Sequence, residues 1–176
     1  MPTSHPPPDP SSPVGQLLLG IDQAWHSKSW HGSTLRGALS RVTPEMAAWR
    51  PGPSRDSDRP NIWEIAVHCA YWKHIVLRRI AREAPEPFPE AGSDWFPRPT
   101  GPDGSVGHKA WKADLELLGG IHRQLRAAVA ALAPEDLVTY PGTTTTRVDD
   151  LVRGIAFHDV HHGGQVQVLK KLWGVR

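Results

Sequence analysis

The sequence predicts an all-α fold, a four-helix bundle, and two observations carry that prediction. Four long stretches repeat apolar residues every three or four positions, which is the period of an amphipathic helix, and proline- and glycine-rich segments separate them. Polar and apolar residues alternate over no comparable stretch, and the β-prone run Thr143–Thr146 is short. Four long amphipathic helices in one domain bury their apolar faces well as a bundle.

The first helix is expected at about residues 14–42. Gly32 and Gly37 weaken its second half, which allows a break near Ser29–Ser33. Thr43–Pro44 is typical of an N-cap followed by a proline at the first helical position, so it begins a further short helix.

The second helix is expected at about residues 61–83, with an inner stripe that reads Ile65, His68, Cys69, Trp72, Ile75, Val76 and Arg79. Residues 84–107 follow, with six prolines and four glycines. A connection of that length is usually functional or spans the domain end to end. Its aromatic residues are expected to pin it to the body: Phe88, Trp95 and Phe96.

The third helix is expected at about residues 108–132, with one apolar face formed by Trp111, Leu115, Leu118, Leu125, Val129 and Leu132. Thr146–Asp149 resembles a capping box that begins the fourth helix. That helix is expected to continue to Trp173 and to stop at Gly174.

Composition excludes several classes of protein. The 176 residues suit one domain with a real core. The 20 Lys and Arg against 18 Asp and Glu give a net charge of +2, too small to predict a nucleic-acid or membrane partner. The one Cys excludes an internal disulfide framework and a Cys-rich zinc module. No apolar run approaches the roughly 18 to 20 residues that span a bilayer.

The N-terminal segment differs from the rest, with six prolines in residues 1–13. It has too few apolar residues to offset the entropy of ordering. We therefore expect residues 1–13 to be an extended or disordered leader and residues 14–176 to be the bundle domain. The leader has neither the cationic start nor the apolar region of a secretory signal, so a cytoplasmic location is expected.

The fourth helix carries polar residues on its inward stripe, which reads Leu151, Ile155, His158, His162, Gln165, Val166, Leu169 and Leu172. His158 and His162 are four residues apart, so their imidazoles project side by side and can share one metal ion. His68 lies inward on the second helix, and facing helices commonly build such sites. Three neutral imidazoles with open positions are typical of a catalytic site. The alternative is that they are hydrogen-bonded core residues.

Gln165 follows His162 by one turn and could bind water or substrate or orient a ligand. Cys69 projects about 100° away from His68 and is expected to pack as a small buried hydrophobe. The histidines outside these groups are interpreted as tail, surface or helix-end residues: His5, His26, His74, His108 and His122.

Three further residues are candidates to line the site: His31, Tyr140 and His161, the last about 60° off the stripe. Four tryptophans at helical spacing are expected in the core: Trp25, Trp63, Trp72 and Trp111. Trp95 and Phe96 could instead form a wall above the metal.

Three segments together resemble the DinB/YfiT-like metalloenzyme superfamily. His158–Gln165 (HDVHHGGQ), followed by Leu169–Gly174 (LKKLWG), resembles the signature of its last helix. Asn61–Trp72 (NIWEIAVHCAYW) resembles its second-helix signature, in which a ligand histidine precedes an aromatic residue. Trp30–Leu39 (WHGSTLRGAL) resembles the first helix of one branch, so the resemblance extends from about Val14 to Gly174.

The resemblance implies a four-helix bundle with up-down-down-up order, a long crossover between the second and third helices, and a homodimer. It also implies that the metal ligands are His68, His158 and His162. Relatives often carry Arg after the last histidine, whereas this chain has Gly163, which would permit close packing of a neighbouring helix or subunit.

The resemblance further implies a metal-dependent transferase that activates a low-molecular-weight thiol toward an electrophilic small molecule. A metal with three imidazole ligands lowers the pKa of a bound thiol or water, which is consistent with that chemistry. The metal stays open among Zn, Ni, Fe, Mn and Cu. The alternatives are a non-catalytic metal- or ligand-binding dimer in stress response or regulation, and a metal-dependent hydrolase. No inward Glu follows the His pair as a general base, and Asp159 is expected to point elsewhere.

Overall fold

The computed structural model describes residues 8–26, 29–51, 59–92, 94–98 and 107–175. All regular structure within these residues is helical, which confirms the all-α prediction. The elements are α1 (Pro13–Trp25), α2 (Leu35–Leu39), α3 (Pro44–Ala48), α4 (Ile62–Ile80), α5 (His108–Ala130), the 3₁₀ helix η1 (Pro134–Val138) and α6 (Val148–Gly174). Residues 1–7 of the expected leader, His5 among them, lie outside the described residues.

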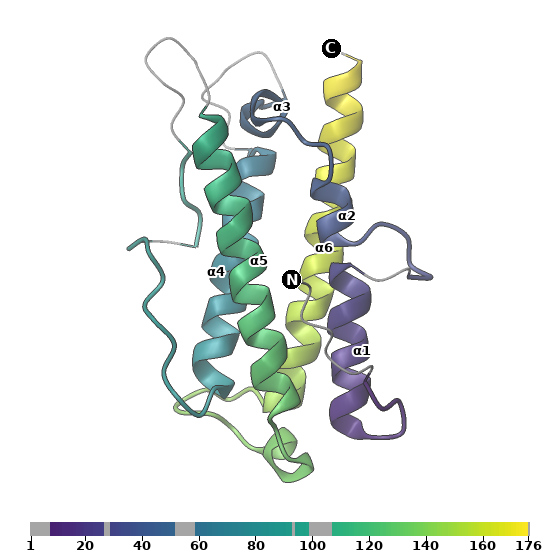
Figure 1. Cartoon of the computed structure of the whole chain (residues 1–176), viewed down its shortest axis with the longest axis vertical. Coiled ribbons are helices and arrows are strands. Elements are labelled where there is room, and N and C mark those ends of the chain that lie inside the picture. Colours follow the sequence, from purple (N-terminus) through teal and green to yellow (C-terminus); the bar gives the residue numbers. More distant parts are fainter. Residues whose placement is uncertain (1–7, 27–28, 52–58, 93, 99–106, 176) are drawn as a thin grey trace.

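The long helices α1, α4, α5 and α6 form a bundle, and α2 continues beyond α1 along α6 (Figure 1). In that view α1 and α6 run upward, whereas α4 and α5 run downward side by side. Because α4 and α5 run in the same direction, the chain between Ile80 and His108 has to return along the length of the bundle. Within the described residues, no helix combines the length and the apolar character needed to cross a membrane.

Short polar side chains begin most of the helices, as their sequences predict. The side-chain oxygens of Ser12, Thr34, Thr43 and Asn61 each accept a backbone N–H from the first turn of α1, α2, α3 and α4, respectively. At α4 the carboxylate of Glu64 also accepts the backbone N–H of Asn61, which completes a capping box.

One predicted helix start is wrong, and one predicted break is confirmed. Helix α6 begins at Val148 without a side-chain cap, because the hydroxyl of Thr144 accepts the backbone N–H of Thr146 and Asp149 pairs with Arg153 instead. The break allowed near Ser29–Ser33 is confirmed, because the stretch 14–42 forms two helices, α1 and α2, separated by residues 26–34.

The inner stripe of α4 also differs from the prediction. It continues from Val76 to the buried Ile80, so Arg79 lies outside it and is exposed to water. Lys73, which is not part of the predicted stripe, takes an inward position and is 1% exposed.

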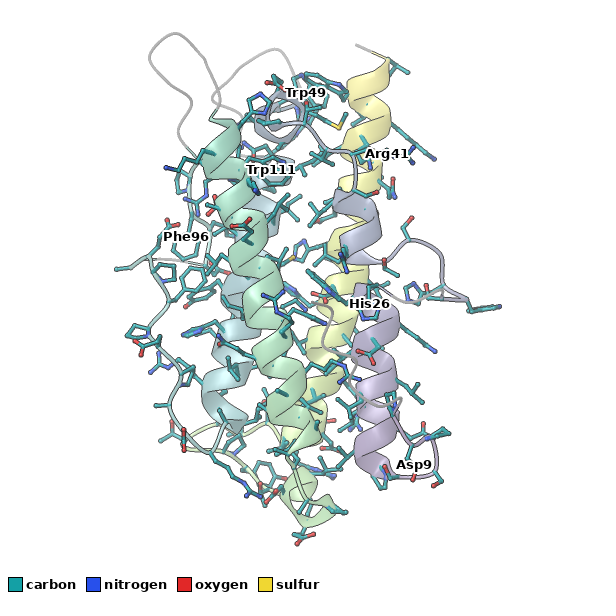
Figure 2. All side chains as sticks on the ribbon, viewed as in Figure 1. Asp9, His26, Arg41, Trp49, Phe96 and Trp111 are labelled. Carbon is teal, nitrogen blue, oxygen red and sulfur yellow. The ribbon has the colours of Figure 1, made fainter. Side chains whose placement is uncertain are left out.

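The core extends over the length of the bundle in two apolar clusters, one on each side of the middle. Trp25, Trp63 and Trp111 are buried in it as predicted, whereas Trp72 is half-buried. Figure 2 shows Trp111 near the start of α5, where its indole N–H donates to the backbone carbonyl of Val42 at 3.1 Å.

The crossover after α4 is fastened to the bundle by aromatic and ionic contacts. Phe96, which is labelled in Figure 2, is buried, and together with Phe88 it packs against Tyr71 of α4. Arg98 pairs with Glu90 and lies 3.3 Å from Asp114 of α5. These contacts hold the segment against the α4 side of the bundle. Residues 94–96 of the segment lie over the middle of the bundle.

Candidate metal centre

Three imidazoles converge in the middle of the bundle, one from α4 and two from α6. The Nε2 atom of His158 lies 3.2 Å from Nε2 of His68 and 3.1 Å from Nε2 of His162. His68 and His162 are buried at 5% exposure each, and His158 is half-buried. These are the three residues that the sequence predicts as ligands, and the group could hold a metal ion.

The separations between the nitrogens suit ligands of one ion. Bonds of about 2.1 Å would place neighbouring ligand nitrogens about 3.4 Å apart in a tetrahedral site and about 3.0 Å apart in an octahedral one. The observed 3.1 and 3.2 Å lie between these values.

The tautomers of two imidazoles are fixed by the hydrogen bonds of their outer nitrogens, the Nδ1 atoms, which point away from the other two rings. Nδ1–H of His68 donates to the backbone carbonyl of Asp94 at 2.8 Å, and Nδ1–H of His162 donates to Oε1 of Gln165 at 2.7 Å. Their Nε2 atoms therefore carry lone pairs, and both point at Nε2 of His158. One proton on His158 could satisfy both contacts only by being shared, whereas a cation accepts all three lone pairs.

Burial keeps these imidazoles neutral, which is the form that binds metal. Burial, helped by the neighbouring His162 and His68, lowers the pKa of His158 to about 3. Burial lowers the pKa of His162 to about 4, although the hydrogen bond to Gln165 opposes the shift. The pKa of His68 is also lowered by burial, against the opposing effect of the Asp94 carbonyl.

The crossover forms one wall of this centre. The indole of Trp95 stacks on the imidazole of His68 with ring centroids 3.9 Å apart, and it lies edge-on to His162 at 6.2 Å. Trp95 keeps 38% of its surface exposed, so its outer part faces solvent beside the three imidazoles. The carboxylate of neighbouring Asp94 accepts the indole N–H of Trp72 at 3.3 Å. Trp95 thus occupies the place expected for a wall residue, whereas Phe96 packs in the core.

The weaker candidates divide clearly. Gln165 lies beside the centre as expected. His161 is exposed, and its ring centroid lies 4.9 Å from that of His162. In the described part of the chain, His31 and Tyr140 are exposed and neither hydrogen-bonds to nor stacks on the three imidazoles. Cys69 is fully buried, as expected of a small hydrophobe.

Gly163 is buried where α6 packs against the start of α2. A Cβ atom there would lie 3.6 Å from the backbone of Leu35, which is an ordinary van der Waals distance. The packing expected at this glycine is therefore with a neighbouring helix, and an alanine would fit there as well.

Two histidines were assigned wrongly from the sequence. His74 and His122 are 3% and 2% exposed, not at the surface. Asp159 was expected to point elsewhere on the helix, but it is buried close to His158 and forms an ion pair with Lys73, which was not predicted from the sequence. The available signal was helical spacing, because Asp159 follows Ile155 by four residues and so shares its inward side.

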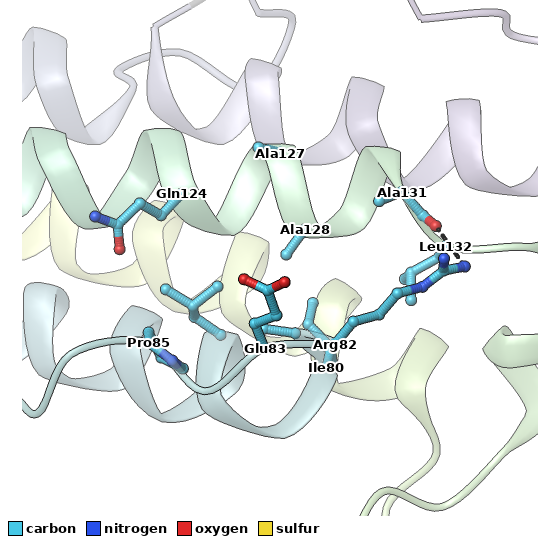
Figure 3. A pocket seen from close by; sticks show the side chains of 11 residues that line it. Ile80, Arg82, Glu83, Pro85, Gln124, Ala127, Ala128, Ala131 and Leu132 are labelled. Carbon is cyan, nitrogen blue, oxygen red and sulfur yellow. Dashed lines mark hydrogen bonds between the residues drawn. The ribbon is translucent and has the colours of Figure 1, made fainter.

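A cavity of about 400 Å³ lies away from the histidines, between the C-terminal ends of α4 and α5 (Figure 3). Its walls are mainly aliphatic, and at its rim Arg82 donates to the backbone carbonyl of Ala131 at 3.4 Å. None of the three imidazoles lines it, so it is not part of the candidate metal centre.

Comparison with known proteins gives one positive result. No curated protein and no solved structure significantly matches the chain. The family model of the DinB superfamily matches residues 29–166, a segment that includes α4 and all three converging histidines. Because the match covers most of its 176 residues, the chain belongs to the DinB superfamily.

Proposed function

We propose that His68, His158 and His162 hold one divalent metal ion and that the chain is a metal-dependent enzyme. In this proposal the enzyme activates a low-molecular-weight thiol for transfer to an electrophilic small molecule. The observation that carries it is the convergence of three neutral imidazole nitrogens, two pairs of them 3.1 and 3.2 Å apart. Among the described residues no fourth acidic, Cys or His side chain joins this group, so an ion there would keep open positions.

When bound, such an ion supplies a Lewis acid that lowers the pKa of a thiol or water at an open position. The protein residues orient and shield this position. Asp94 and Gln165 fix two imidazoles through their outer nitrogens, and Trp95 covers one side with an apolar ring. An apolar wall that shields part of this position reduces the access of water, which would otherwise compete with the thiol.

The burial of Cys69 supports a reaction in which the thiol comes from a cosubstrate. It is the one cysteine of the sequence, it is fully buried, and burial raises the pKa of its thiol well above the usual value. A buried, protonated thiol is a poor nucleophile. A thiol that takes part in the reaction therefore has to arrive as a cosubstrate.

The test is a panel of thiols (bacillithiol, mycothiol, glutathione and cysteine) against monochlorobimane, with the protein loaded in turn with Zn, Ni, Fe or Mn. We expect at least one thiol and metal to give turnover that a chelator and His158→Ala abolish. His108→Ala, which removes an exposed histidine outside the centre, should keep the activity. Turnover without a thiol would favour the hydrolase, and metal binding without any turnover would favour the non-catalytic binding protein.

We also propose that the chain forms a homodimer through α6. Three apolar residues on its outer face are strongly exposed: Phe157, Val168 and Leu172, at 69%, 57% and 42%. Val168 and Leu172 are four residues apart and so lie on one side of the helix, and Val175, directly after the end of α6, is 81% exposed. Contiguous exposed apolar residues of this kind mark interaction surfaces.

A further inference from the structure

A buried polar layer crosses the bundle next to the candidate metal centre, and each long helix contributes one residue to it. Lys73 of α4 and Asp159 of α6 form an ion pair in which both side chains are 1% exposed. Nζ of Lys73 also lies 3.4 Å from Nδ1 of His122 in α5 and 5.3 Å from the ring centroid of Trp25 in α1. His122 in turn stacks on Trp25 with ring centroids 4.3 Å apart.

Stability alone is a weak reason for such a layer. Removing two charges from water is so costly that a buried ion pair often contributes no more stability than well-packed apolar residues would. Buried polar groups that do not improve stability are expected mainly at functional sites. The residues around Asp159 should therefore show what function the ion pair serves.

Asp159 adjoins the one candidate ligand whose outer nitrogen has no partner. Among the described residues, Nδ1 of His158 is buried without a hydrogen bond, and so is Oδ1 of Asp159. A ring nitrogen of His158, a carboxylate oxygen of Asp159 and Sγ of Cys69 all lie within 4.8 Å of one another. The other two imidazoles each donate Nδ1–H to an oxygen, of Asp94 and of Gln165.

We propose that Asp159, held by Lys73, is the positioning residue of His158. Its free oxygen accepts the Nδ1 proton of His158, either directly or through one water molecule, and so fixes Nε2 as the nitrogen that binds metal. Metal-binding histidines nearly always donate their other N–H to such an oxygen. Cys69 is the weaker acceptor, since a protonated thiol accepts poorly. The inference rests on the proposed metal site.

The test compares two double variants that each remove one ion pair between helices without leaving a lone charge. Lys73→Met/Asp159→Leu removes the proposed acceptor. Asp22→Leu/Arg126→Met removes the pair between α1 and α5, in which Arg126 donates to both carboxylate oxygens of Asp22 at 2.7 and 2.9 Å. The dissociation constant for Zn²⁺ is measured by competition with a chelator at pH 7.5.

We expect Lys73→Met/Asp159→Leu to weaken zinc binding about 10- to 100-fold and Asp22→Leu/Arg126→Met to leave it nearly unchanged. Lys73→Met/Asp159→Asn keeps a carbonyl oxygen and should recover part of the affinity. Equal affinity of wild type and Lys73→Met/Asp159→Leu would overturn the proposal, and so would an equal loss in both double variants. A loss in Cys69→Ala as large as that in Lys73→Met/Asp159→Leu would assign the role to Cys69.

A second measurement detects the Nδ1 proton of His158 directly. It can be made on the wild type, so it still tests the proposal if a variant fails to fold. In the zinc-loaded wild type, NMR should detect a slowly exchanging Nδ1–H of His158, and it should exchange faster in Lys73→Met/Asp159→Asn. An Nδ1–H that exchanges rapidly in the wild type would contradict the proposal. If the wild type binds no metal, the proposed function fails; if it binds metal and the acceptor variants bind it equally well, this inference alone fails.

Discussion

The indole of Trp95 lies flat on the imidazole of His68, with ring centroids 3.9 Å apart and planes inclined by 11°. The two residues come from different parts of the fold, His68 from the middle of α4 and Trp95 from the crossover that follows it. The preceding residue, Asp94, accepts the Nδ1 proton of the same imidazole. The crossover therefore both fixes the orientation of one candidate ligand and covers one of its faces.

This contact predicts that Trp95 reports metal binding by its fluorescence. A paramagnetic ion such as Ni²⁺ or Cu²⁺ in the centre should quench the tryptophan emission of the wild type, and Trp95→Phe should lose the largest share of the quenching. Trp111→Phe is the control, because Trp111 donates its N–H to Val42 in the core cluster. Quenching that is equally strong in Trp95→Phe would show that the ion binds elsewhere.

Gln165 is predicted to strengthen metal binding through His162. Gln165→Ala removes the acceptor of the Nδ1 proton and should weaken the zinc affinity about 10- to 100-fold, measured by chelator competition. Gln167→Ala is a matched control on the same helix, since Gln167 donates to Ser33 at 2.9 Å and touches none of the ligands. If both alanine variants bind zinc as the wild type does, Gln165 has no role in orienting His162.

Because His122 is buried, the stability of the fold is predicted to decrease at acidic pH. Burial, followed by the charge of Lys73, lowers the pKa of His122 far below its usual value, so the folded protein keeps this residue neutral. The unfolded chain binds a proton there below about pH 6.5, so the stability lost on acidification increases as the pH falls. His122 lowers the free energy of unfolding by up to about 1.4 kcal/mol for each pH unit below this value, and by about 2 kcal/mol between pH 6.5 and 5.

Urea unfolding of the metal-free protein at pH 7.5 and 5 measures this effect. His122→Gln cannot take up the proton, so it should lose less stability on acidification than the wild type, by about 2 kcal/mol. The other histidines contribute to both proteins and cancel in the comparison. Equal losses in the two proteins would contradict a buried neutral His122.

The outer face of α6 is predicted to form the interface of the proposed homodimer. Val168→Lys places a charge among the exposed apolar residues of this face and should convert the dimer to a monomer in light scattering after gel filtration. Val138→Lys is the matched control, because Val138 and Val168 are equally exposed at 57% but Val138 lies in η1. A wild type that is monomeric at high micromolar concentration, or a dimer that tolerates Val168→Lys, would reject this interface.

Local sequence signals were enough to predict the helices and the pair His158 and His162, whereas His68 was predicted from its inward position on another helix and from the family resemblance. The pair His158 and His162 lies four residues apart, so one helical turn brings the two rings together whatever the rest of the fold does. Thr43 and Pro44 likewise begin α3 as their residue types predict. The same reasoning failed at Thr146, because a neighbouring hydroxyl competed for the backbone N–H that a capping box would use.

The remaining features depend on contacts between distant segments. His122 is buried because Trp25 and Lys73, from two other helices, meet it in the middle of the bundle. Lys73 can be buried only because Asp159 of α6 neutralises it. Helical periodicity places each of these residues on a face, but it does not show which face of another helix lies opposite.

The metal content of the protein, purified without a metal-affinity tag, tests the central claim most directly. Elemental analysis should find about one divalent metal ion per chain, because the three imidazoles form one site with open positions. His158→Ala should lose most of this metal, since it removes the imidazole that contacts both of the others, whereas His108→Ala should keep it. A His158→Ala protein that retains the full metal content would contradict the assignment of His68, His158 and His162 as the ligands.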